Sequence, residues 1–345
     1  MRAACGLWVS FLVACGGDVA GDASVPLDAT SSDAALVDGA SVDAALVDAA
    51  PVDAGDGTGW RDEAATPVRI QEIAVEAHAG RIWVAGGFDA RATVVATVRT
   101  YDPATRTWST GPDLPAPRHH LVLVSHGGDL YALGGMQTVA FEPLDTAWVL
   151  RAGADAWAPI APLLRDRGAA AAGSVGDVIV VVGGNETSGG LASETLIYDP
   201  ARDAWSLGAP IPTPREHLAA VAVDAELYVL AGRRNSLGSA RADLEIYDPV
   251  ADAWRAGPEL PYPRGGFDAD LLEGAIYVVG GEEPMNVLRT VDRLDLATAT
   301  WGPAPDTRVP HHGHGIAALD GRLYVIAGAS TPAFGAIDAV ESYAP

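Results

Sequence analysis

The chain has 345 residues and a net charge of −23, with 45 acidic residues against 22 basic ones, all of which are arginine. This balance excludes nucleic acid and anionic membrane surfaces as partners, because phosphate binding needs clustered Lys and Arg. The two cysteines, Cys5 and Cys15, both lie near the N-terminus. The rest of the chain therefore offers no disulfide, thiolate metal site or cysteine nucleophile.

Residues 1–14 have the features of a signal peptide. Arg2 precedes an apolar run over residues 7–14, which is too short to span a bilayer as a permanent helix. The stretch Leu12-Val13-Ala14-Cys15 resembles a bacterial lipobox, where the chain is cut before a cysteine that is then acylated. The resemblance implies lipidation of Cys15, export, and a lipid anchor in the bacterial cell envelope, facing the periplasm or the cell surface. An ordinary secretory signal that contains a cysteine is the alternative.

Residues 15–59 form a second segment, built from Ala, Val, Asp, Gly and Ser. It has nine aspartates and no basic or aromatic residue. Such a segment cannot bury enough apolar surface to offset its chain entropy, so we expect a disordered tether. The aspartates lack the spacing of a calcium-binding loop.

A short apolar run that ends in glycine then recurs six times, as in Leu227-Tyr228-Val229-Leu230-Ala231-Gly232. The closing glycines are 47 to 49 residues apart, a period typical of repeated supersecondary units. Each run is short and rich in Val, Ile, Leu and Tyr, which predicts a buried strand. Alanine replaces the glycine before the closing one at Ala231 and Ala327, whereas the closing glycine never changes, which indicates a positive φ or a close backbone approach there. The closing glycines are Gly87, Gly135, Gly184, Gly232, Gly281 and Gly328.

A tryptophan precedes each closing glycine by 27 residues. The six are Trp60, Trp108, Trp157, Trp205, Trp254 and Trp301. The last unit ends at Pro345 before a Trp of its own, while Trp60 stands ahead of the first unit. The N-terminal Trp60 strand can therefore complete the C-terminal unit and close the array into a ring.

The pattern resembles the kelch family, whose units carry a strand ending in Gly-Gly, a Tyr-Asp-Pro turn and a Trp. Tyr101-Asp102-Pro103, Tyr198-Asp199-Pro200 and Tyr247-Asp248-Pro249 match this turn, and the second unit departs with Trp148. The resemblance implies an all-β, six-bladed kelch-type β-propeller over residues 60–345, closed by the Trp60 strand. We expect a monomer.

In this topology the links that follow the Trp strands share one face with the long loops that follow the closing glycines. We therefore interpret positions ten to thirteen after each Trp as a ring of candidate ligand-binding residues. Four of its six members begin with arginine, and six of the eight histidines of the chain lie in it. The candidates are Arg118, His119, His120, Arg167, Arg215, Glu216, His217, Arg264, His311, His312 and His314.

Each residue type has two interpretations. The arginines either bond backbone carbonyls and acidic groups, as the kelch resemblance implies, or capture a carboxylate or sulfate through their planar donors. The histidines, which do not repeat, either bond channel water or bind a cation such as Zn²⁺ with Glu216 or Glu72. Since no helical His-x-x-x-His spacing is present, the sequence predicts no metal site and no cofactor.

The first functional hypothesis is a non-catalytic, envelope-tethered module that binds a protein or a glycan. It predicts an exposed apolar patch on the loops, for example around Phe88, Met136, Met285 or Phe334. The alternative is an enzyme like the kelch-related mutarotases and epimerases of acidic sugars, with an Arg and Glu ring at the channel mouth; this predicts a pocket with a carboxylate of shifted pKa beside the arginines. A kelch-like copper oxidase is set aside, because its cofactor needs a cysteine.

Overall fold

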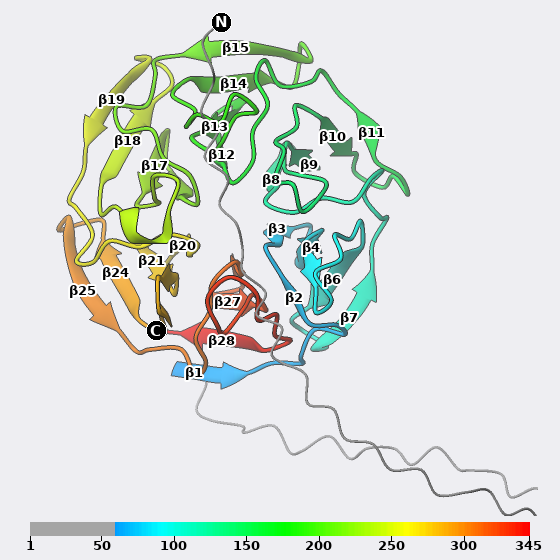
Figure 1. The fold of residues 1–345 in the computed structure, drawn as a ribbon, viewed down its shortest axis with the longest axis vertical. Coiled ribbons are helices and arrows are strands. Elements are labelled where there is room, and N and C mark those ends of the chain that lie inside the picture. The colour runs from blue at the N-terminus through cyan, green and yellow to red at the C-terminus, as the bar shows by residue number, and fades with distance from the viewer. Residues whose placement is uncertain (1–58) are drawn as a thin grey trace, which may run out of the picture. The chain divides into compact units, whose positions relative to one another are not determined.

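The computed structural model describes residues 59–345. Six antiparallel sheets of four strands each stand around a central axis (Figure 1), which confirms the six-bladed propeller. The predicted signal peptide, the predicted lipidation of Cys15 and all of the predicted tether except Gly59 lie outside the described residues. Gly59 begins a strand and so belongs to the propeller. From residue 59 onward, no helix is long and apolar enough to cross a membrane.

Each of the first three blades contains four strands that follow in chain order from the axis to the rim. Blade 1 contains β3 (Ala74–His78), β4 (Arg81–Ala85), β6 (Val98–Asp102) and β7 (Thr107–Thr110). Blade 2 contains β8 (Val122–His126), β9 (Asp129–Leu133), β10 (Ala147–Leu150) and β11 (Ala158–Pro159). Blade 3 contains β12 (Ala171–Val175), β13 (Val178–Val182), β14 (Thr195–Asp199) and β15 (Ala204–Gly208).

The last three blades follow the same order, apart from the final strand of blade 6. Blade 4 contains β16 (Ala219–Val223), β17 (Glu226–Leu230), β18 (Leu244–Asp248) and β19 (Ala253–Ala256). Blade 5 contains β20 (Asp268–Leu272), β21 (Ala275–Val279), β24 (Val291–Asp295) and β25 (Thr300–Ala304). Blade 6 contains β26 (Gly315–Leu319), β27 (Arg322–Ile326), β28 (Val340–Ala344) and β1 (Gly59–Asp62). Short pieces in the loops are β2 (Ile70–Gln71), β5 (Phe88–Asp89), β22 (Glu282–Glu283), β23 (Asn286–Val287) and the 3₁₀ helix η1 (Leu237–Ser239).

The strand β1 closes the ring as the position of Trp60 predicts. It pairs antiparallel with β28, with Trp60 opposite Tyr343. Just after β1, the Glu63 carboxylate accepts hydrogen bonds from Tyr101 of blade 1 (2.7 Å) and from Ser342 of blade 6 (2.6 Å). The first described segment therefore supplies a strand to the last blade and ties that blade to the first.

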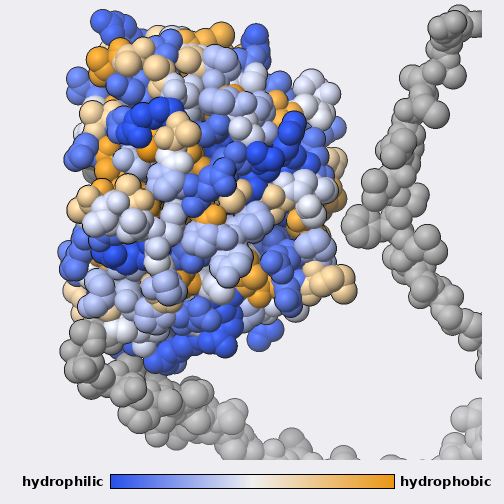
Figure 2. Space-filling view, turned by 90° about the vertical axis from the view of Figure 1, so that its left-hand side faces the viewer, coloured by the Kyte–Doolittle hydropathy of each residue, from blue (hydrophilic) through white to orange (hydrophobic). Residues whose placement is uncertain are grey.

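The recurring tryptophans join neighbouring blades. In every blade the indole Nε1 donates to a backbone carbonyl that lies four residues after the Trp of the preceding unit, at 2.6 to 2.9 Å. Trp205, for example, donates to the carbonyl of Ala161. The apolar core is divided in the same way, since each of its six clusters lies between two adjacent blades. The rim around β19 and β25 is mainly hydrophilic, with scattered hydrophobic residues (Figure 2).

The closing glycines have both a positive φ and a close backbone approach, the two properties that their constancy in the sequence indicates. Their φ angles run from +85° to +111°, outside the range that L-residues adopt readily. A Cβ at Gly328 would also stand 2.5 Å from the carbonyl oxygen of His312. The preceding position is less demanding, because Ala327 occupies it at a φ of +51°.

Candidate functional site

One position of the repeat encircles the axis with its backbone. It is the residue twelve positions after each Trp, and all six members have a left-handed φ between +51° and +64°. Each donates its N–H to the carbonyl of the preceding member, at 2.6 to 3.2 Å, so that six hydrogen bonds form a closed circle. We call this circle the axial ring. Its members are Glu72, His120, Ala169, His217, Gly266 and Gly313.

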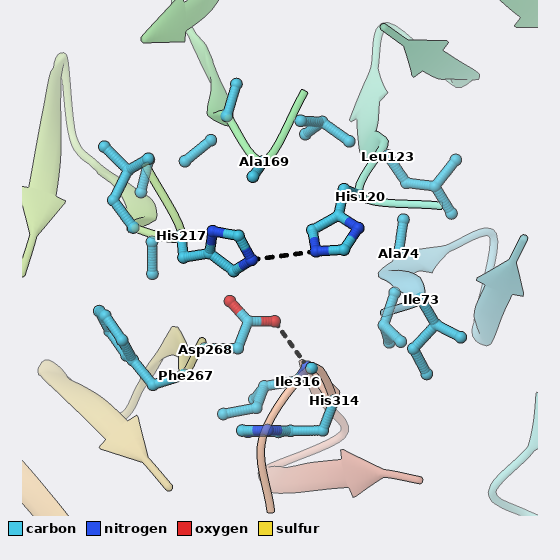
Figure 3. A pocket seen from close by; sticks show the side chains of 18 of the residues that line it. Ile73, Ala74, His120, Leu123, Ala169, His217, Phe267, Asp268, His314 and Ile316 are labelled. Carbon is cyan, nitrogen blue, oxygen red and sulfur yellow. Dashed lines mark hydrogen bonds between the residues drawn. The ribbon is translucent and has the colours of Figure 1, made fainter. Parts of the chain in front are cut away.

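Three members of the axial ring bring polar side chains together. His120 Nε2 lies 3.0 Å from His217 Nε2, and the two rings point toward one another (Figure 3). The same His120 nitrogen lies 3.0 Å from Glu72 Oε2. The three ligand-type atoms of Glu72, His120 and His217 all lie within 4.8 Å of one another.

A second layer of charged groups surrounds these three side chains. Glu216 Oε2 stands against His217 Nδ1, and its other oxygen accepts from Arg233 Nε at 3.0 Å. Arg233 Nη1 also donates to Glu282 Oε1 at 2.5 Å. His312 Nδ1 faces two carboxylates, at 3.6 Å from Glu282 and 3.7 Å from Glu72.

Burial and neighbouring charges shift the pKa values of this group. Burial, then the charge of Arg233, holds the pKa of His217 well below its usual value. Burial alone raises the pKa of the Glu72 carboxyl, but the neighbouring and hydrogen-bonding His120 brings that pKa well below the usual range. Burial and the charge of His120 lower the pKa of His119 to about 4. The site thus favours an ionised Glu72 carboxylate together with neutral His119 and His217 rings.

The axial ring borders a central cavity of about 200 Å³. Its walls are the six inner strands, and three further carboxyl groups line it: Glu76, Asp268 and Asp270. Asp268 and Asp270 accept backbone N–H bonds from Ile316 (2.8 Å) and Ala318 (2.6 Å) of blade 6. Burial raises the pKa of Asp268 to about 7 and that of Asp270 to about 6, and raises that of Glu76 well above its usual value.

The four candidate arginines do not line this cavity. Arg215 and Arg264 are fully buried in their blades, where they pair with Glu245 and Asp292 and donate to strand carbonyls such as Val229 O (3.1 Å). Arg167 pairs with Glu186 at 2.7 Å. In blade 2 the Arg118 guanidinium carbon lies 4.6 Å from the centre of the Trp148 ring. None of these four arginines is therefore available as a clamp for an acidic sugar, and the enzyme hypothesis loses the arginines on which it was based.

Blade 6 carries His311 where four other blades carry arginine. The His311 ring bonds the Ala327 carbonyl (2.8 Å) and the Glu341 carboxylate (3.2 Å), which are the same kinds of partner that the buried arginines have. His314 is also buried, and it lines the cavity wall beside Ile316 (Figure 3).

Aromatic side chains gather on the loop face next to the axial ring. Phe88 is buried, and its ring centre lies 4.1 Å from that of His119. Phe141 and Phe334, from the loops of blades 2 and 6, pack against Phe88 at 6.1 and 5.5 Å. These two remain 44% and 51% exposed. We call Phe88, Phe141 and Phe334 the aromatic cluster.

Sequence reasoning missed several members of the site. The carboxyl groups Asp268, Asp270 and Glu76 were hidden in inner strands, although alternating Asp-Ala-Asp in an otherwise apolar strand is a usable signal. Arg233 and Glu282, directly after two closing glycines, belong to loops whose fold no short motif specifies. Of the apolar loop residues expected to be exposed, Phe334 and Met285 are, whereas Phe88 and Met136 are buried.

Comparison with known proteins identifies the repeats. The KLHDC2/KLHL20/DRC7 Kelch-repeats domain matches residues 161–328, and the Kelch motif matches residues 72–115. Among curated proteins, Kelch-like protein 35 of Mus musculus is 29% identical over 157 residues, which are 43% of this chain and 25% of that protein. Kelch-like protein 23 of Homo sapiens is 31% identical over 109 residues, 31% of this chain and 19% of that protein. The chain thus carries kelch repeats and spans about a quarter or less of the length of these relatives.

Among solved structures, the one titled "Structure of YjhT" superimposes with a TM-score of 0.70 at 12% identity. The superposition covers 81% of this chain and 95% of the other. At this identity the likeness shows a shared propeller fold and nothing about activity.

Proposed function

We propose that this kelch propeller is a non-catalytic binding module, tethered in the bacterial cell envelope through Cys15, that binds a protein partner with its loop face. The aromatic cluster is the observation that carries the proposal. Rigid aromatic anchors in a partly desolvated setting dominate the free energy of most protein interfaces. Kelch propellers generally mediate protein binding, which favours a protein over a glycan as the partner.

Buried side chains form hydrogen bonds to the backbone of the two loops that carry Phe141 and Phe334. His119 Nε2 bonds the Thr138 carbonyl of the blade 2 loop at 3.0 Å. His312 Nε2 bonds the Thr331 carbonyl of the blade 6 loop at 2.9 Å, and Gln71 donates to the neighbouring Ala333 carbonyl at 2.7 Å. A partner would therefore meet a surface that loses little conformational entropy on binding.

A double variant tests the binding surface. Phe141→Ser with Phe334→Ser removes the exposed aromatic area while leaving the buried Phe88 in place. The full chain and this variant are cross-linked in cells, and the attached proteins are identified. A partner that is recovered with the unchanged chain should be reduced at least about tenfold with the variant, because loss of an aromatic anchor costs more than about 1.4 kcal/mol.

Val250→Ser is the matched control, since Val250 is 91% exposed in a turn between β18 and β19. Its partners should equal those of the unchanged chain. Equal recovery with all three versions contradicts the proposed face, and recovery of glycan alone makes the module a lectin instead.

The tether has its own test. Cys15→Ser removes the proposed acylation site, so the protein should move from the membrane fraction to the soluble fraction of the envelope. Membrane fractionation that is unchanged by the substitution contradicts the lipid anchor and leaves the binding face untouched.

A further inference from the structure

The side chains of the axial ring present unshared electron pairs to one another. Thr138 O can only accept, so the His119 nitrogen that bonds it carries the proton. Neutral His119 then accepts at Nδ1, and the His120 Nδ1 that lies 2.5 Å away must donate. When His120 carries only that one proton, its Nε2 is a free lone pair that faces both Glu72 and His217.

The same reasoning applies to His217. A carboxylate oxygen of Glu216 stands against His217 Nδ1, and although neither atom makes a hydrogen bond, its negative charge favours a proton on that nitrogen. His217 Nε2 is then also an acceptor, and it faces His120 Nε2 at 3.0 Å. With Glu72 Oε2 at 3.0 Å from the same His120 nitrogen, three atoms of the kinds that bind metal ions converge within 4.8 Å of one another.

The charges of these side chains also favour a bound cation. Glu72, Glu216 and Glu282 carry three negative charges around this point, and the Arg233 guanidinium pairs with the latter two only. With neutral imidazoles the group keeps two negative charges, although Glu216 and Glu282 are only 3% and 4% exposed. Buried charges in proteins are normally paired or coordinate a metal ion.

From this geometry we infer that Glu72, His120 and His217 bind one divalent transition-metal ion of the Zn²⁺ class. Two imidazoles and one carboxylate are a donor set that Zn²⁺ uses where a fourth position stays open. Bonds of about 2.0–2.1 Å in tetrahedral geometry place neighbouring ligand atoms about 3.3 Å apart. The His120 nitrogen lies 3.0 Å from each of the other two ligand atoms, which is close to this value. Glu216 and the His119 ring orient the two ligand imidazoles from behind.

The rest of the axial ring leaves room for the ion. Ala169, Gly266 and Gly313 occupy the other three positions and present little or no side chain. A Cβ at Gly313 would lie 2.5 Å from Glu72 Oε1, so this glycine makes space for the carboxylate. The three ligand residues all line the central cavity, whose wall also carries the carboxyl groups of Glu76, Asp268 and Asp270.

Metal binding to the full chain tests the inference. Cys5 and Cys15 are replaced by Ser in every version, so that no thiolate competes. After treatment with a chelator, titration calorimetry with Zn²⁺ should show one ion per chain and a melting temperature that rises with Zn²⁺. Co²⁺ in its place should give the visible absorption bands of a four-coordinate site.

The variants separate this site from other ligands on the surface. His120→Ala and His217→Ala should each weaken Zn²⁺ binding more than about 100-fold, and the orienting variant Glu216→Gln about 10- to 100-fold. Glu72→Gln keeps the side-chain shape and supplies the test should an Ala variant fail to fold. His126→Ala is the matched control with unchanged affinity, since His126 ends β8, the inner strand that follows His120 in blade 2, and bonds Ser174 instead.

Two results would overturn the inference. The first is no Zn²⁺ binding by the unchanged chain, which makes a shared proton the occupant of the His120 and His217 pair. The second is equal affinity in the control and in all ligand variants, which places the ion elsewhere.

Discussion

The six units repeat a side chain at the rim of this propeller, but only a backbone conformation at its axis. At the rim, all six units place the same residue, a Trp, and make the same hydrogen bond to the preceding blade. At the axis, all six units share one backbone conformation and one backbone hydrogen bond, but the residues are Glu, His, Ala, His, Gly and Gly. The circle at the axis uses only N–H and C=O groups, so the side chains there are free to differ.

That freedom has a limit, because a left-handed φ disfavours residues with a Cβ. It costs about 1–2 kcal/mol at a non-glycine residue, and Glu72, His120 and His217 all adopt it. Gly266 and Gly313 show that glycine satisfies the same position. Three polar residues at strained positions, with their side chains touching, point to a function rather than to stability.

The largest loss of stability should come from removing β1, the strand that closes the ring against β28. Deleting residues 59–68 removes β1, the Trp60 bond and the Glu63 contacts, and exposes β28 as an open edge. We expect the free energy of unfolding to fall by several kcal/mol, which a thermal melt of the full and shortened chains will measure. The control is a chain that begins at Pro51, which should melt like the full chain. A deletion that leaves the melting temperature unchanged would contradict the closure.

The next largest effect tests whether the buried arginines belong to the scaffold. Arg215→Met leaves the Glu245 carboxylate, which is 7% exposed, without its cation. Removing one partner of a buried ion pair costs about 3–5 kcal/mol, measurable by urea unfolding. Adding Glu245→Gln should recover part of the loss. A single variant with the stability of the unchanged chain would show that Arg215 does not hold blade 4 together.

The difference between rim and axis also explains what the sequence could predict. Trp and glycine at fixed spacing reveal blade number, strand order and closure, because each unit repeats the same local physics. The axial ring was predicted as a set of positions, but which side chains touch could not be read. His120 and His217 are 97 residues apart and meet only because the circle brings blades 2 and 4 together across the axis.

Residues that lie close together in the sequence can also point in different directions, which spacing does not reveal. Arg118 and Glu216 precede axial-ring residues by two and one positions, yet the first points into its blade and the second toward the axis. A strand alternates its side chains, but these residues lie before the inner strands, in links whose backbone turns through a left-handed residue. Sequence spacing alone therefore predicted that Arg118 and Glu216 both lie at the channel mouth.

A pair of matched substitutions in blade 6 tests the two glycine positions that the repeat treats differently. Gly328→Ala puts a Cβ against the His312 carbonyl at a φ of +88°, and should cost about 1–3 kcal/mol in chemical unfolding. Ala327→Gly one residue earlier relieves a left-handed alanine at the expense of chain entropy, so we expect a change of less than about 1 kcal/mol. Equal effects would mean that close approach does not distinguish the two positions.

The smallest effect is a pH dependence set by the axis. Burial raises the pKa of Asp268 to about 7, so the folded chain keeps a proton that the unfolded chain releases near pH 4. Stability from this group is therefore greatest at low pH and is lost as the pH rises from about 4 to about 7. Asp268→Asn cannot titrate, so its melting temperature relative to the unchanged chain should rise across that window. Asp270→Asn should show the same trend ending near pH 6, since its pKa is raised to about 6. A constant difference across pH 4 to 7 would mean that water in the cavity keeps both carboxyl groups at their usual pKa, and that the axis is wetter than its burial indicates.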